Sequence, residues 1–187
     1  GFCRTGRMFA TEYWKEAGIQ PDIISTAKSI AGGVPLSAII ASAEIMDAPA
    51  PGTIGGTFCG NALACAAALK VIEVMERDHL ADRSLEIGRT VMARYTAMLE
   101  KYECVGDVRG LGGMVGIEFV TDKASKTPDA ALTAAIIQEC ARNGLMVESA
   151  GTYSNVIRFL APLVMTDEQL ACGLDILERA IQTCSAK

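Results

Sequence analysis

The first 80 residues contain apolar runs with the lengths of strands, followed by one long helical run. Ile23–Ile24 and Ala38–Ala41 are short apolar runs bounded by turn residues, which predicts two strands. A loop of small residues and prolines occupies 47–56. Alanines, leucines and valines then fill several faces of 62–76, as expected for a helix buried against a sheet.

The remaining residues show helical and strand spacing in turn, and a boundary near 78–82 separates them from the first part. Val108–Val120 predicts glycine-rich strands, in which Val115, Ile117 and Phe119 alternate with Met114, Gly116 and Glu118. The other expected elements are an amphipathic helix from Leu85 to Tyr102, a helix at 130–143 ended by Gly144, strands at 145–148 and 156–163, and a last helix that begins with the capping-box pattern Thr166-Asp167-Glu168-Gln169.

Composition and charge exclude several classes of protein. With 187 residues, 50% hydrophobic and 21% charged, the chain is globular. A net charge of −5 and a pI near 5.0 argue against nucleic acid and anionic membranes as partners. No apolar run is long enough for a membrane span, and the first ten residues do not resemble a signal peptide, so we expect a cytoplasmic protein. The seven scattered cysteines and the single His79 predict reduced thiols and no metal site.

Lys28 is the residue whose position most needs a chemical explanation. It follows Ile23-Ile24 and precedes Gly32-Gly33, which predicts a lysine at the end of a buried strand. Desolvation favours the neutral amine, which is the form that attacks a carbonyl to make a Schiff base. The alternative is a lysine that extends along the strand end and keeps its ammonium in water.

Arg158 and Thr57 are the other candidates. Arg158 lies in an apolar run, where its charge is costly unless an anion such as a carboxylate pairs with it; the alternative is the exposed face of an alternating strand. Thr57 follows Gly55-Gly56 and precedes a helix, a weak pattern for an anion site. Arg109, which glycine follows, looks like a turn anchor, and Arg4 is ambiguous.

The segment 25–36, Ser-Thr-Ala-Lys-Ser-Ile-Ala-Gly-Gly-Val-Pro-Leu, closely resembles the cofactor-lysine segment of class III (subgroup II) pyridoxal-phosphate aminotransferases, most of all the 4-aminobutyrate aminotransferases. Four more segments follow the family pattern in order: Gly1–Arg7, Gly55–Asn61, Val108–Gly112 and Asn155–Leu163. Five ordered motifs over essentially the whole chain form a strong signal, although each alone is weak.

The resemblance implies an α/β chain that is the C-terminal portion of a fold-type I transferase, with the end of the large cofactor domain at 1–80 and the small domain at 81–187. It implies that Lys28 binds pyridoxal 5'-phosphate as a Schiff base and then moves a proton. It also implies that Arg158 binds a substrate carboxylate and that Thr57 binds the cofactor phosphate of the neighbouring subunit in a homodimer with composite sites. The implied reaction is 4-aminobutyrate plus 2-oxoglutarate giving succinate semialdehyde plus glutamate.

Other functions stay open. Family members are longer, and their Asp-Glu-Val-Gln element, glycine-rich phosphate loop and ring-stacking aromatic are absent here, so we expect part of a longer protein that is inactive alone. Alternative activities are those of the ornithine, acetylornithine, 5-aminovalerate and diaminopelargonate aminotransferases and of the glutamate-semialdehyde aminomutase. A non-catalytic truncated interaction domain is an alternative of another class. A Schiff-base lyase without a phosphate cofactor is disfavoured by Thr57 and its glycines.

Overall fold

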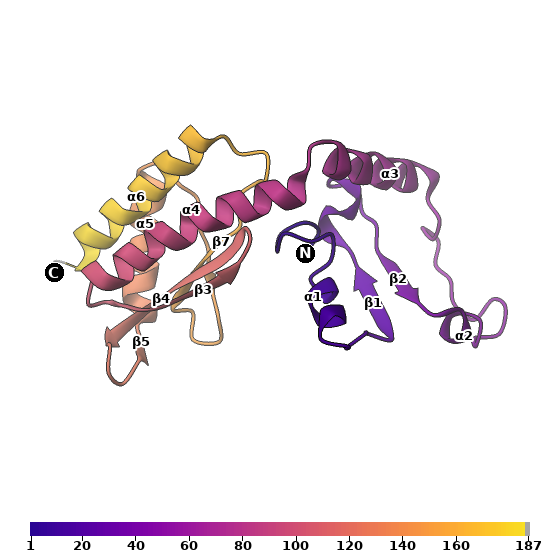
Figure 1. The fold of residues 1–187 in the computed structure, drawn as a ribbon, viewed down its shortest axis with the longest axis horizontal. Helices are drawn as coiled ribbons and strands as arrows, with labels where there is room; N and C mark the ends of the chain where they lie inside the picture. Colours follow the sequence, from indigo (N-terminus) through magenta and orange to yellow (C-terminus); the bar gives the residue numbers. More distant parts are fainter. Residues whose placement is uncertain (186–187) are drawn as a thin grey trace. The chain divides into compact units, whose positions relative to one another are not determined.

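The computed structural model describes residues 1–185, and the chain forms two compact units (Figure 1). Unit 1 comprises Gly1–Cys3 and Arg7–Leu80. Unit 2 comprises Arg4–Gly6 and the chain from Ala81 onward. A three-residue segment near the start therefore belongs to the later unit.

Unit 1 contains two short strands and one long helix. Strands β1 (Ile23–Thr26) and β2 (Ala38–Ala41) pair antiparallel, with Ile23 opposite Ala41 and Thr26 opposite Ala38. The predicted strands and the predicted helix after Asn61 are confirmed. The other elements are α1 (Thr11–Glu16), the 3-10 turn η1 (Lys28–Ala31), α2 (Ala43–Met46) and α3 (Ala62–Arg77).

The prediction that β1 and α3 are buried is wrong. Ile23 and Ile40 are each about half exposed, at 54% and 48%, and α3 buries only Ala64 and Ala68 of its side chains. Two strands bury little surface unless a further layer covers them, and within unit 1 as described no such layer is present.

Unit 2 is a helix-covered antiparallel sheet with strand order β3-β4-β7-β6, to which β5 adds by pairing with β4. Its elements are α4 (Leu80–Lys101), β3 (Val105–Leu111), β4 (Met114–Asp122), β5 (Thr127–Pro128), α5 (Ala130–Arg142), β6 (Ser149–Ala150), β7 (Val156–Phe159) and α6 (Asp167–Ser185).

The core of unit 2 follows the predicted alternation. Val115, Ile117 and Phe119 of β4 are fully buried, whereas the intervening residues are partly exposed. The helices supply the rest of this core, with Tyr95 from α4 and Ile136 from α5 among the largest buried side chains. The face of the sheet that carries these residues is therefore the inner face, and the other face is the more exposed one.

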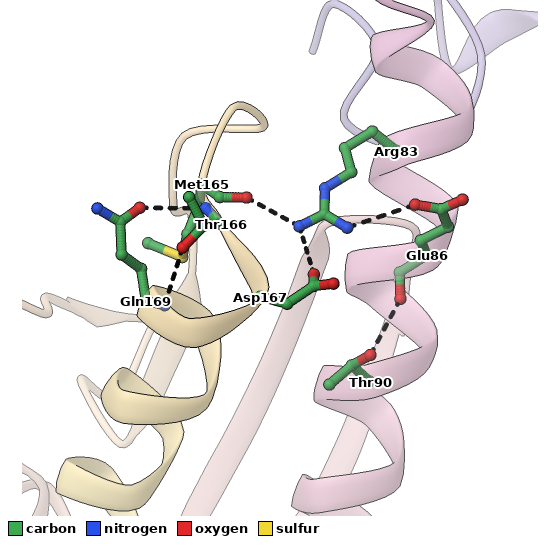
Figure 2. Close-up of polar contacts among 7 residues, drawn as sticks. All are labelled: Arg83, Glu86, Thr90, Met165, Thr166, Asp167 and Gln169. Atoms are coloured by element: carbon green, nitrogen blue, oxygen red, sulfur yellow. Dashed lines mark hydrogen bonds and ion pairs between the residues drawn. The ribbon is translucent and has the colours of Figure 1, made fainter.

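The strand prediction is less accurate after α5. Residues 145–148 form no strand, β6 is only Ser149–Ala150, and β7 ends at Phe159 instead of Leu163. Strand β7 pairs with β6 only through Val156 and Ile157, so residues 145–148 have no strand to pair with. The capping box is confirmed: Gln169 N donates to Thr166 Oγ1 at 3.2 Å, and Thr166 N donates to Gln169 Oε1 at 3.1 Å (Figure 2).

Residues 1–185 contain neither a membrane-spanning helix nor a cluster of metal-ligating side chains. None of the helices in that range is long and apolar enough to cross a membrane. The same range contains no group of three or more histidine, cysteine, aspartate or glutamate residues placed to hold a metal ion.

Candidate active site

Lys28 stands at the turn that follows β1. Its φ is +56°, in the left-handed region that residues other than glycine rarely adopt, and Gly32 ends the turn at φ +59°. Strained backbone of this kind costs roughly 1–3 kcal/mol and is concentrated at functional sites. The side chain is exposed, which agrees with the alternative of a lysine that extends into water and not with a buried one, and within residues 1–185 it makes no hydrogen bond or ion pair. Its amine is free to react.

Packing fixes the backbone that carries this lysine. The turn η1 packs against α3, and Ala31 is 1% exposed. A Cβ added at Gly32 would lie 3.1 Å from Cγ2 of Val71 on α3, so the turn and the helix are already in close contact. Lys28 therefore combines a fixed backbone with an open side chain, as a site that positions a reactive amine requires.

Thr57 lies in the turn before α3, four residues before the helix cap. Asn61 is that cap, and its Oδ1 accepts a hydrogen bond from Ala64 N at 3.0 Å. Thr57 is exposed, and a Cβ added at Gly55 would meet nothing within 4 Å. The hydroxyl and its glycine neighbours are therefore accessible to an anion, but the helix terminus itself already has a side-chain cap.

Arg158 lies on the outer face of the unit 2 sheet. In the strand register it is opposite Gly116, which is in turn opposite Arg109, so the three residues form one row across β7, β4 and β3. Arg158 is exposed although the neighbouring Ile157 is fully buried. The structure thus agrees with the alternative of an exposed strand face and not with a charge enclosed among apolar side chains, because the alternation of the strand turns this side chain outward.

The two arginines of that row differ in their partners. Arg109 donates to Asp107 and, at 2.7 Å, to Glu118, and these bonds raise its pKa, with Asp107 contributing most. Within residues 1–185 no carboxylate pairs with Arg158. Arg109 is therefore a structural residue, although it lies in a strand and not in a turn, and Arg158 is the arginine available to an external anion.

Arg158 also borders a cavity of about 390 Å³ in unit 2. The other lining residues are mainly apolar and come from α4, the segment after α5, β7 and the segment after it, and α6, among them Tyr95, Leu145, Phe159 and Leu174. Such a lining does not suit a charged substrate, so the outer face of the sheet is the better place for a carboxylate.

The candidates fall in different units: Lys28 and Thr57 belong to unit 1, and Arg158 belongs to unit 2. Sequence reasoning did not find the role of Arg4, whose guanidinium donates to the backbone carbonyl of Ala161. No local pattern could have revealed it, because 157 positions separate the two residues.

The family model for class-III aminotransferases matches residues 1–181. The chain belongs to this family. It is 44% identical to the 4-aminobutyrate aminotransferase of Escherichia coli (strain K12) over 96% of its own length, and 47% identical to a 5-aminovalerate aminotransferase of Pseudomonas putida over 95%. In both comparisons it spans 41% of the relative, so it is about two fifths as long as these proteins.

A solved structure gives the fold of this class-III aminotransferase chain. An amine transaminase from an uncultivated Pseudomonas species, in its form with bound pyridoxal phosphate (PLP), matches with a TM-score of 0.88 and 31% identity, over 98% of this chain and 43% of that one. The two units therefore have the α/β fold of a fold-type I transferase, as the sequence predicted.

Proposed function

We propose that the complete protein is a PLP-dependent aminotransferase that transfers the amino group of 4-aminobutyrate to 2-oxoglutarate, giving succinate semialdehyde and glutamate. The observation that carries this proposal is the family match over residues 1–181, combined with 44% and 43% identity to two 4-aminobutyrate aminotransferases. The two units then correspond to the end of the large cofactor domain, residues 1–80, and the small C-terminal domain, residues 81–187.

The described residues fit PLP in the chemistry of their donors. Lys28 offers an exposed primary amine on a fixed turn, and Thr57 offers a hydroxyl beside two accessible glycines. When bound, PLP supplies an electron sink for the carbon that loses its proton. Lys28 would hold the cofactor of its own subunit through Nζ, and Thr57 would donate to the phosphate of the neighbouring subunit's cofactor.

Lys28 would have a second task in the reaction. Its Nζ would take the proton from the carbon that bears the amino group and later give a proton back, as a general base and then a general acid. Arg158 would hold the carboxylate of whichever substrate occupies the site, the amino donor first and the 2-oxo acid afterwards, through two parallel N–H donors, and so orient the reacting carbon.

We further propose that the protein is at least a homodimer, in which Thr57 of each subunit serves the phosphate of the other subunit's site. We place it in the cytoplasm. Within residues 1–185 the seven cysteines form no disulfide.

A second candidate donor is 5-aminovalerate, because a relative named for it is 47% identical to this chain. It is one methylene longer than 4-aminobutyrate, and one methylene changes binding in a pocket by about 1–3 kcal/mol. The two donors are thus separable by kcat/KM.

The test uses the full-length protein loaded with PLP and supplied with 2-oxoglutarate. Glutamate formation is measured with 4-aminobutyrate, 5-aminovalerate and ornithine, with Lys28→Ala as the inactive control. The highest kcat/KM is expected for 4-aminobutyrate. A higher value for 5-aminovalerate would reassign the substrate, and no glutamate from any donor would favour the non-catalytic alternative.

A further inference from the structure

Arg4–Gly6, which we call the N-terminal strap, packs against α4 and the turn between β3 and β4. Ser84 of α4 is fully buried, and its Oγ donates to the Arg4 carbonyl oxygen at 2.6 Å and accepts from Gly113 N at 2.8 Å. Gly112 packs on the strap so closely that an added Cβ would lie 2.7 Å from the same carbonyl oxygen. The backbone of Arg4 is therefore fixed from two sides.

The Arg4 side chain extends from the strap to the segment that follows β7. Its Nη1 donates to the carbonyl oxygen of Ala161, three residues after Arg158. The guanidinium is partly buried, which lowers its pKa, and within residues 1–185 no carboxylate pairs with it. A guanidinium has five N–H donors, and burying one without an anion is costly, so this arginine is a poor choice for stability alone.

The segment between β7 and α6 is held at both ends by arginines. Arg4 binds Ala161 near Arg158, and Arg83 of α4 binds the carbonyl oxygen of Met165 at 2.8 Å, beside the start of α6. Figure 2 shows Arg83 with its further partners Asp167 and Glu86. Two arginine-to-carbonyl hydrogen bonds thus hold the segment between β7 and α6. Only the bond from Arg4 to Ala161 lies next to Arg158, the candidate carboxylate-binding residue.

We propose that Arg4 is a positioning residue for Arg158: through Ala161 it fixes the end of β7 and thereby the direction in which the Arg158 guanidinium meets a substrate carboxylate. This inference rests on the carboxylate-binding role proposed above for Arg158. Arg4 itself does not touch the substrate. Its contribution is to reduce the freedom that Arg158 loses on binding, which is a gain in affinity by preorganisation.

The experiment is a double-mutant cycle in the full-length, PLP-loaded protein, with glutarate as an unreactive dicarboxylate probe and its dissociation constant measured by calorimetry. Arg4→Gln is expected to weaken glutarate binding about tenfold, the order of magnitude of one hydrogen bond from a charged group. Arg4→Lys, which keeps one donor for Ala161, is expected to recover most of that loss. Arg83→Gln is the matched control and should lower the unfolding midpoint without changing glutarate affinity.

The cycle separates this inference from the proposal on which it depends. If Arg4 acts through Arg158, then Arg4→Gln/Arg158→Gln binds glutarate no more weakly than Arg158→Gln alone. Additive losses, or an Arg4→Gln protein with a lower unfolding midpoint and unchanged affinity, would overturn the positioning role. If Arg158→Gln itself leaves glutarate affinity unchanged, it is the proposed function of Arg158 that fails. Should Arg4→Gln not fold, Arg4→Lys takes its place in the same cycle, with a smaller expected loss and the same non-additivity.

Discussion

Gly88 of α4 lies directly against Gly112 in the turn between β3 and β4. A Cβ built on Gly88 would come within 2.2 Å of the Gly112 carbonyl oxygen, and that oxygen belongs to backbone that cannot rotate away. Gly112 in turn has φ +55° and packs on the strap that carries Arg4. One helix glycine therefore sets the distance at which α4, the hairpin and the strap assemble.

Gly88→Ala is expected to destabilise the protein by about 1–3 kcal/mol, the usual cost of forcing an extra methyl group into a closed contact. The gain in helix propensity, about 1 kcal/mol, does not compensate for moving the backbone of the hairpin. The measurement is the urea midpoint of the full-length protein, followed by far-UV circular dichroism.

Gly173 provides the matched control, because it is also a glycine inside a helix, α6. An added Cβ there would lie 3.5 Å from Cδ1 of Leu145, an ordinary van der Waals distance. Gly173→Ala should therefore be neutral or stabilising by up to about 1 kcal/mol. Equal effects at the two positions would show that the close approach of Gly88 to the hairpin is not what matters.

Arg158→Gln should lower kcat/KM for 2-oxoglutarate and for the amino donor, which corresponds to a rise of roughly 2–4 kcal/mol in activation free energy, because the substrate loses the bidentate partner proposed above. Arg109→Gln is the control from the same row of the sheet. The Arg109 guanidinium already donates to Asp107 and Glu118, so its loss should not change kcat/KM. Cofactor content should be unchanged in both. A loss of cofactor in Arg158→Gln, with carboxylate dependence retained, would make Arg158 a structural residue.

Lys28→Ala should abolish turnover, because it removes the amine that we propose binds the cofactor and moves the proton. Borohydride reduction of the loaded wild-type protein, followed by peptide mapping, should place the label on Lys28. Lys70 is an internal comparison in the same unit, since its Nζ pairs with Glu73 at 2.7 Å. Label on Lys70 or any other lysine would contradict the assignment.

The features that the sequence predicted correctly depend on short stretches of chain. The alternation of Val115, Ile117 and Phe119 and the capping box at Thr166 are readable because strand period and cap geometry act over a few residues. The strand expected at 145–148 failed because pairing needs a partner elsewhere in the chain.

The candidate site shows the same division. Lys28 was found from its flanking motif, but the motif left open whether its side chain is buried or exposed, since burial depends on layers that unit 1 does not supply. The contact of Arg4 with Ala161 joins residues 157 positions apart, and only the folded chain brings them together.

Thiol reactivity should separate the cysteines of unit 2. Cys140 is fully buried, and that burial raises the pKa of its thiol to about 11, so at neutral pH it is almost entirely the unreactive thiol. Cys172, which is exposed on α6, is the comparison. Alkylation with iodoacetamide and mass mapping should label Cys172 in the native protein and Cys140 only after unfolding. Native labelling of Cys140 ahead of Cys172 would contradict this core packing.

Glu178 of α6 should make the stability of unit 2 depend on acid pH. Its carboxylate accepts from Lys101 at 2.8 Å and from Arg94 at 3.1 Å, both on α4, and these bonds lower its pKa from 4.5, Lys101 contributing most. A carboxyl whose pKa is lower in the folded state stabilises the fold fully above its unfolded pKa. That stabilisation is lost as the pH falls from 4.5 toward the folded value.

The prediction is therefore a lower unfolding free energy with falling pH in the acid range, and a weaker dependence in Glu178→Gln, which cannot titrate. Lys101→Gln should remove more of the pH dependence than Arg94→Gln, because Lys101 lowers the Glu178 pKa more and Arg94 also serves Asp175, at 2.7 Å. Urea midpoints of the full-length protein between about pH 5 and pH 3 provide the measurement. The same slope in the wild type and Glu178→Gln would mean that the pairing of α4 with α6 contributes nothing to acid stability.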